Sequence, residues 1–257
     1  MRFLKYLRTM LRSFYSRELY REVATRWDVG VVLYLLFVLT VCWIFMMLKI
    51  QLEINQSAKL FASEYASQFP LLTIKNGVIS TPENHPYVIQ DPNTKQVFAT
   101  VDTSSQNKNL DLSTRTIIVT NNKIMWTSHD GVVKTYQLAK NINMTLDPIM
   151  LKDKLLSWAK WSWLLIFPMF LLVSFSYRLV EALIYAVIGK ILGLVARVSL
   201  PYTTVFKLTI VAMTPVIVIG TLLDWFELNF PRIAVLYFVL ALTYILFAVS
   251  SNRTKKY

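Results

Sequence analysis

The most constraining feature of the sequence is an uncharged run, Gly30 to Met47, placed directly behind its most basic stretch. An apolar run of this length is about what one helix needs to cross the roughly 30 Å hydrocarbon core of a bilayer. Basic residues beside such a run normally stay on the cytoplasmic side. The preceding charged residues are Arg2, Lys5, Arg8, Arg12, Arg17, Arg21 and Arg26 against Glu18, Glu22 and Asp28. We therefore predict a transmembrane helix over 29–50, entered from the cytoplasm.

The composition favours a membrane protein. Of the 257 residues, 55% are hydrophobic, and the mean hydropathy is +0.45. A soluble domain with that balance would expose too much apolar surface. The net charge of +12 is concentrated at the N-terminus and at the ends of apolar runs, where topology rules and anionic lipids account for it. We expect membrane lipids, including anionic head groups, as partners, and no nucleic acid.

The single cysteine, Cys42, lies inside the first apolar run. No intrachain disulfide is possible, so an extracytoplasmic domain must be held by its own core. About 28 residues precede the run and no small-x-small cleavage site closes it. This pattern predicts an uncleaved anchor rather than a signal peptide.

Three later runs are also apolar enough to cross a bilayer. They predict spans at about 158–179, 205–223 and 233–250. Four spans place both basic termini in the cytoplasm and leave Asp224 and Glu227 outside, as the charge bias prefers.

Residues 180–198 form a further apolar segment, which carries Glu181, Lys190 and Arg197. Counting it as a fifth span would place the basic C-terminal tail outside. We interpret it either as a cytoplasm-side continuation of the second span or as a helix lying at the interface. Residues 156–257 then form a three-helix membrane unit.

Small residues recur within this segment at helical spacing. Because they line one helix face, they allow helix backbones to approach closely. The partner is either another helix of the same chain or a second subunit. The residues are Ala182, Ala186, Gly189 and Gly193.

Arg178 and Glu181 stand three apart and can pair across one helical turn. One span length from Trp158, they fall near the cytoplasmic boundary and predict an interfacial ion pair. The same pair buried at mid-bilayer would instead indicate a functional site. Pro215 predicts a kink in the third span.

The N-terminal segment, 1–28, is amphipathic. Apolar residues recur at helical spacing with Arg and Lys between them. This pattern is typical of a helix lying in the head-group plane. The alternative is a docking helix for a cytoplasmic partner.

Residues 51–155 form the one substantial polar region, which the topology places outside the cytoplasm. Its start, 52–69, continues the first span as a helix, and about six short strands follow in a small, mostly antiparallel sheet. Asn76-Gly77 is a strong hairpin signal, and Asp130-Gly131 predicts another turn. From Asp147 the chain becomes helical again. The fold class is therefore a four-span α-helical membrane protein with a small α+β domain inserted between spans one and two.

Catalytic and metal motifs are weak throughout. His85 and His129 have no ligand spacing, so we expect no metal site. Asp91, Asp102, Asp111 and Asp130 sit at strand ends or turns, where carboxylates most often bond local backbone. Two S-x-x-K matches are near chance for a serine–lysine dyad. They are Ser105 with Lys108, and Ser157 with Lys160. We expect no catalytic residue, no cofactor and no enzymatic activity.

Three ordered groups of short motifs are spread over nearly the whole chain. They are Ser13-Phe14-Tyr15-Ser16 with Leu19-Tyr20-Arg21; Pro86-Tyr87-Val88-Ile89 with Asp91-Pro92 and Val101-Asp102-Thr103; and Ala212-Met213-Thr214-Pro215. Together they resemble an uncharacterised bacterial integral-membrane family, domain-of-unknown-function family 1189. The resemblance implies the architecture above, in the bacterial cytoplasmic (inner) membrane, and supplies no catalytic residues.

Some members of that family carry a MalA-type maltodextrin-utilisation name, which implies an accessory role beside a transporter. The last three spans are also loosely similar to the Yip group of small membrane proteins, a likeness of fold alone.

Two functional hypotheses follow. In the first, the protein is a non-enzymatic accessory or scaffold subunit of a bacterial envelope or transport assembly, with another membrane protein as partner. In the alternative, the extracytoplasmic domain binds or senses a glycan, lipid or envelope peptide. A membrane enzyme would require Ser105, Lys108 or a carboxylate pair to converge in a closed pocket.

Overall fold

The computed structural model describes residues 2–83, 85–91, 94–104, 117–127, 132–228 and 230–253. The chain forms two compact units. We call Met1–Ile50 together with Trp163–Tyr257 the helical unit, and Gln51–Ser162 the strand unit. Helix α3, Gly30–Leu60, contributes residues to both.

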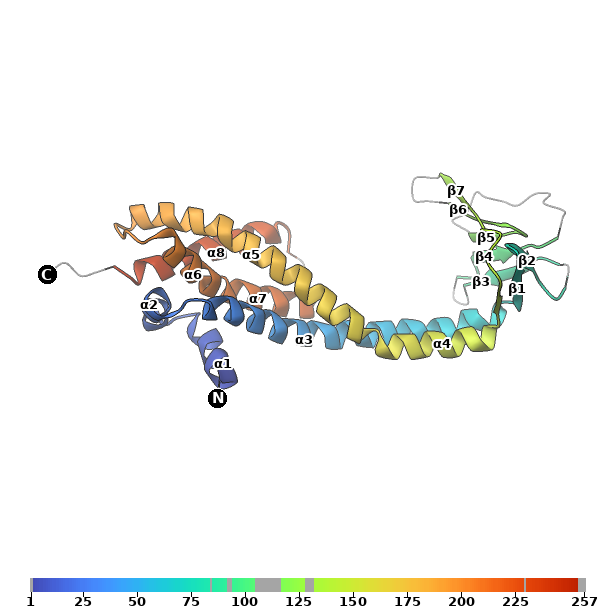
Figure 1. Cartoon of the computed structure of the whole chain (residues 1–257), viewed down its shortest axis with the longest axis horizontal. Helices are drawn as coiled ribbons and strands as arrows, with labels where there is room; N and C mark the ends of the chain where they lie inside the picture. The colour runs from blue at the N-terminus through green and yellow to red at the C-terminus, as the bar shows by residue number, and fades with distance from the viewer. Residues whose placement is uncertain are drawn as a thin grey trace. The chain divides into compact units, whose positions relative to one another are not determined.

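The helical unit is built almost entirely from apolar helices. In the described part of the chain, four helices are long and apolar enough to cross a membrane, the number expected: Gly30–Gln68, Trp163–Val195, Tyr202–Trp225 and Ile233–Ser250. Within this unit, α5 packs against α6 and α8, and α2 packs against α6 (Figure 1). The helices besides α3 are α1 (Arg2–Arg12), α2 (Arg17–Arg26), α5 (Trp163–Val195), α6 (Tyr202–Ala212), α7 (Thr214–Trp225) and α8 (Ile233–Ser250).

The N-terminal segment forms two helices, α1 and α2, where the periodicity alone indicates a single one. Ser16 has an extended backbone, and its side-chain oxygen accepts a hydrogen bond from the Leu19 N–H at 3.3 Å. A serine in this position satisfies an otherwise unpaired N–H at a helix start. The chain therefore ends one helix near Arg12 and begins the next at Arg17.

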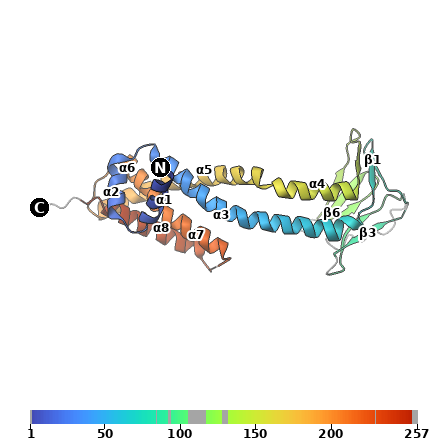
Figure 2. The same cartoon turned by 90° about the horizontal axis from the view of Figure 1, so that it is seen from below.

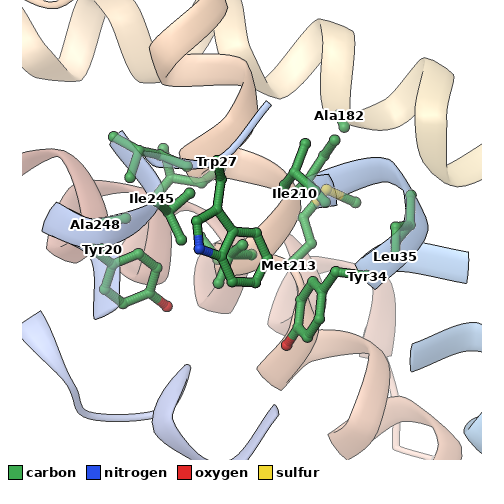
Figure 3. Packing of buried hydrophobic residues seen from close by; sticks show 14 of the residues in the cluster. Tyr20, Trp27, Tyr34, Leu35, Ala182, Ile210, Met213, Ile245 and Ala248 are labelled. Atoms are coloured by element: carbon green, nitrogen blue, oxygen red, sulfur yellow. The ribbon is translucent and has the colours of Figure 1, made fainter. Parts of the chain in front are cut away.

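The core of the helical unit lies between α2, α3, α6 and α8. Tyr20, Tyr34 and Ile245 are fully buried there. Figure 3 shows the ring of Trp27 beside that of Tyr34, with a centroid distance of 5.6 Å and an edge-on geometry. Edge-on aromatic pairs are favourable beyond the area they bury.

Helix α5 is continuous from Trp163 to Val195, so residues 180–195 continue the helix that begins at Trp163. It ends where Arg197 adopts a left-handed conformation with φ of 57°. The Val198 N–H then bonds to the Gly193 carbonyl at 2.8 Å, and the Arg197 N–H bonds to Leu194. This is the Schellman pattern of a helix C-terminus.

The third apolar segment is interrupted at Met213, between α6 and α7. Pro215 lies in the first turn of α7, where its missing N–H removes no helix-interior bond. The interruption falls within two residues of the proline that predicts a kink.

The strand unit contains the end of α3, a π-helical turn (Phe61–Tyr65), a 3₁₀ turn (Ala66–Gln68), eight described strands and α4 (Pro148–Trp161). Figure 2 shows α4 beside the last part of α3. The Gln51 side-chain amide donates to the Ala159 carbonyl at 2.6 Å, and the Ser162 hydroxyl donates to the Gln51 amide oxygen at 3.1 Å. The strands are β1 (Leu72–Lys75), β2 (Val78–Ser80), β3 (Tyr87–Gln90), β4 (Val97–Val101), β5 (Ile117–Val119), β6 (Lys123–Thr127), β7 (Val133–Gln137) and β8 (Met144–Leu146).

These strands form two sheets, whereas the sequence predicts one sheet of about six strands. The orders are β2-β1-β8 and β3-β4-β5-β6-β7, and every pair except β4 with β5 is antiparallel. Strand β8 was not expected. It pairs with β1, which is about 70 residues earlier, and such pairing leaves no local signal.

The hairpin expected at Asn76-Gly77 is present. Lys75 pairs with Val78, and both turn residues have positive φ, 51° and 75°. Such angles are typical of the type I′ hairpin turn. The turn predicted at Asp130-Gly131 lies outside the described residues.

Candidate functional site

The small-residue face of α5 is buried within the helical unit. Ala182, Ala186, Gly189 and Gly193 are all buried in the single chain. A Cβ on Gly189 would lie 2.9 Å from a Val205 methyl and 3.0 Å from an Ile245 methyl. Glycine is therefore needed for the close approach of α5 to α6 and α8, and internal packing accounts for this face.

The N-terminal motif residues divide between surface and core. Tyr15 is 70% exposed, whereas Tyr20 is fully buried and donates its hydroxyl proton to the Ser13 carbonyl. Burial raises the pKa of Tyr20 above its ordinary value. Arg21 Nε donates to the Ser251 carbonyl at 2.7 Å, which joins α2 to the end of α8. Residues of this motif therefore hold α2 against the end of α1 and against the end of α8.

The third motif has a similar structural role. Thr214 and Pro215 are buried at the start of α7. The Thr214 hydroxyl lies 3.1 Å from that of Tyr34 and is hydrogen-bonded to it, joining α3 to α7.

The motif residues of the strand unit also make local structural contacts. Asp91 accepts the Tyr65 hydroxyl at 2.8 Å and the Thr94 N–H at 2.9 Å. Pro86 is exposed just before β3. The ring of the first strand residue, Tyr87, contacts that of His85 in a tilted geometry, with a centroid distance of 4.4 Å.

Asp102 is buried and accepts both the backbone and hydroxyl protons of Ser104, at 2.9 and 2.6 Å. The Thr103 hydroxyl bonds to that of Thr81 at 2.7 Å. Pro92 lies outside the described residues. These contacts shape turns and strand ends, as expected of carboxylates at such positions.

A cavity of about 470 Å³ with a mixed polar and apolar lining lies within the helical unit, between α3, α5, α7 and α8. Arg178 and Glu181 are on its wall, with an Nη1–Oε2 distance of 2.6 Å and side chains only 26% and 18% exposed. Because α5 continues to Val195, this pair lies near the middle of its helix. The position of the pair relative to a bilayer interface depends on the depth of α5 in the membrane, so the interfacial ion pair stays a prediction.

Polar and aromatic groups from the other helices complete the cavity. Asp224 of α7, Tyr237 of α8, and Cys42 and Trp43 of α3 lie on its wall. Sequence reasoning missed these residues as members of one site. One feature of the sequence could have pointed to them. Asp224 and Tyr237 are polar residues within or beside apolar runs, and polar residues in such places often mark functional positions in membrane proteins.

The candidate catalytic groups do not converge in the described residues. Ser157 and Lys160 are exposed on α4, and His85 pairs with Glu83. Ser105, Lys108, Asp111, His129 and Asp130 lie outside the described residues. In the described ranges, no group of three or more His, Cys, Asp or Glu side chains could hold a metal ion.

These elements define a mostly helical protein with four helices able to span a membrane and two small, antiparallel-rich sheets. The family described as "Protein of unknown function (DUF1189)" matches residues 7–249. The chain therefore belongs to this family, as its motifs predict. No curated protein and no solved structure matches it.

Proposed function

We propose that this chain is an integral protein of the bacterial cytoplasmic membrane with four spans, both termini in the cytoplasm and residues 51–155 outside. The observation that carries this proposal is the apolar surface of α5. Leu165, Leu172 and Val195 are 72%, 66% and 76% exposed in the isolated chain. An extensive apolar surface on a long helix is stable in lipid or against another apolar helix, and not in water.

Polar contacts at the two ends of the bundle support this topology. At one end, Lys207 approaches Asp28 at 3.3 Å, and Arg21 bonds to Ser251. At the other end, Lys49 contacts Glu227 at 2.6 Å. The start of α3, the start of α6 and the end of α8 therefore share the side that holds the basic N-terminal segment, as the positive-inside rule requires.

Within the membrane, we assign the protein a non-enzymatic role as an accessory or scaffold subunit. Its partner is another membrane protein that packs on the outward face of α5, because the small-residue face is occupied by α6 and α8. Anionic head groups contact the basic residues of α1 and α2.

Site-directed labelling tests the topology. Single cysteines replace Asp153 or Arg253 in a Cys42→Ala background, and intact cells are treated with a membrane-impermeant maleimide. The cysteine at 153 should react from outside, and the cysteine at 253 only after permeabilisation. Labelling of 253 in intact cells would refute the topology.

Photo-crosslinking tests the subunit role. A photoreactive residue at the exposed positions Leu172, Val180 or Val187 should yield one adduct with another membrane protein. The buried position Ala186 is the matched control and should give none. Lipid adducts alone at the exposed positions would overturn the subunit role and leave membrane insertion standing.

A further inference from the structure

The cavity in the helical unit has the size and the mixed lining of a ligand site. At about 470 Å³ it falls in the range of roughly 300–1,000 Å³ typical of small-molecule sites. Its wall combines apolar side chains with a few polar groups from four helices. The ion pair and small-residue packing described above do not explain why this space is left open.

The charges on the wall favour a cation over an anion. Arg178 is already paired with Glu181 and also stacks over the Tyr177 ring at 5.5 Å. The guanidinium is therefore largely neutralised. Asp224 adds a second carboxylate to the same cavity and makes no ion pair within the described ranges. The net charge of the wall is negative.

The aromatic lining points the same way. The rings of Trp43, Tyr177, Tyr185, Tyr237 and Phe238 border the cavity. Aromatic faces attract ammonium groups, and desolvation strengthens that attraction.

Tyr237 adds a specific polar group. Its hydroxyl is buried without a hydrogen-bond partner in the described part of the chain. Gly220 of α7 lies beside it, since a Cβ there would be in ordinary van der Waals contact, at 3.5 Å, with the hydroxyl oxygen and the ring. An unpaired buried hydroxyl is costly unless a ligand or water completes its bonding.

We propose that this cavity binds a primary ammonium group. Asp224 neutralises the ammonium, the aromatic rings surround it, and the Tyr237 hydroxyl oxygen accepts a hydrogen bond from it. This inference rests on the proposed membrane insertion. Two sources share the chemistry: the head group of an ethanolamine phospholipid, and a soluble organic amine.

Binding to the detergent-purified full chain tests the proposal. Native mass spectrometry compares short-chain phosphatidylethanolamine, phosphatidylglycerol with the same acyl chains, and ethanolamine. The wild type should bind phosphatidylethanolamine about tenfold more tightly than phosphatidylglycerol, as one charge-assisted hydrogen bond allows. Tight binding of ethanolamine as well would support the soluble source. Equal or stronger binding of phosphatidylglycerol, or no binding of any probe, would overturn the proposal.

Variants locate the site. Asp224→Asn should remove most of the preference for phosphatidylethanolamine over phosphatidylglycerol. This variant is expected to fold, because Asp224 is exposed at the cavity and makes no ion pair in the described residues. Gly220→Leu, which places a side chain in the cavity, should abolish the preference. Asp153→Asn on α4 is the matched control and should change nothing. An unaltered preference in Asp224→Asn would contradict the site.

Failure of this proposal is distinguishable from failure of the proposed function. If labelling at 153 and 253 supports insertion but phosphatidylethanolamine is not bound more tightly than phosphatidylglycerol, only the ligand assignment is refuted. If labelling contradicts insertion, the membrane topology is refuted, whatever the binding result.

Discussion

The hydroxyl groups of Tyr34 and Thr214 lie 3.1 Å apart in the interior of the helical unit, where both side chains are buried. This bond joins α3 to the first turn of α7 and places a motif residue in contact with the first apolar helix. It accounts for the burial of both polar side chains, because each hydroxyl gives the other a hydrogen-bond partner.

Tyr34→Phe should therefore destabilise the protein by about 1–2 kcal/mol, since it leaves the Thr214 hydroxyl buried and unpaired. Unfolding by sodium dodecyl sulfate in mixed micelles measures this change. Thr214→Val should have a similar cost, and the double variant should lose less than the sum of the two. Strict additivity would show that the two hydroxyls are not coupled.

Gly189→Leu should reduce the folded fraction, because even a Cβ at this position approaches Val205 and Ile245 within about 3 Å. Gly193→Leu should do the same, since its Cβ would lie 3.0 Å from the Val198 carbonyl oxygen. Overpacking of this kind costs about 1–3 kcal/mol. Fluorescence-detected size exclusion after heating is a suitable measurement. The exposed, outward-facing change Val187→Leu is the control and should have the stability of the wild type.

Gly77→Ala should disrupt the first hairpin of the strand unit. Gly77 has φ of 75°, and an added Cβ would lie 2.7 Å from the Ala139 carbonyl oxygen. Left-handed backbone alone costs a non-glycine residue about 1–2 kcal/mol. Hydrogen exchange over 72–80 in the full-length protein should accelerate. Gly30→Ala offers a matched comparison, because no heavy atom lies within 4 Å of its Cβ position. Equal exchange rates in the two variants would refute this explanation.

The contact between Lys49 and Glu227 should make stability depend on pH. The hydrogen bond and charge of Lys49 hold the pKa of the Glu227 carboxyl below its ordinary value of 4.5. A carboxyl whose pKa is lowered by folding stabilises the protein above its unfolded-state pKa, and this stabilisation is lost as the pH falls through the folded-state pKa.

Thermal unfolding of the wild type and Glu227→Gln tests this dependence between pH 7 and about pH 3. The wild type should be the more stable at neutral pH, and the difference should vanish in acid. Because Glu227 is largely exposed, added salt should reduce the difference. If the difference in thermal stability between the two proteins persists unchanged in acid, ionisation of Glu227 is not its cause.

Arg21→Met should loosen the end of α8. It removes the donor to the Ser251 carbonyl, and a cation at a helix C-terminus contributes about 0.3–1 kcal/mol. Hydrogen exchange over 246–252 should increase. The exposed residue Arg8, for which the structure shows no ion pair among the described residues, provides the comparison Arg8→Met. An equal increase in both variants would indicate a general loss of positive charge.

Local patterns account for the features predicted correctly. The lengths of the uncharged runs predict four helices able to span a membrane, and the Asn76-Gly77 pair predicts its hairpin, because each signal lies within a short stretch of chain. The ordered motifs likewise predict the family. The second sheet was missed because β1 and β8 pair across most of the strand unit.

The sequence patterns therefore indicate which segments are helical and apolar, where basic charge flanks them, and to which family the chain belongs. Which face of each helix turns inward is visible only in the folded bundle. An apolar helix such as α8 carries no periodic polar face from which its rotation could be inferred. Only the packing of α5 on α6 and α8 shows that the small-residue face is used internally. Only the folded bundle gathers Glu181, Asp224 and Tyr237 from three helices around one cavity, because close packing brings together residues whose separation along the chain leaves no local trace.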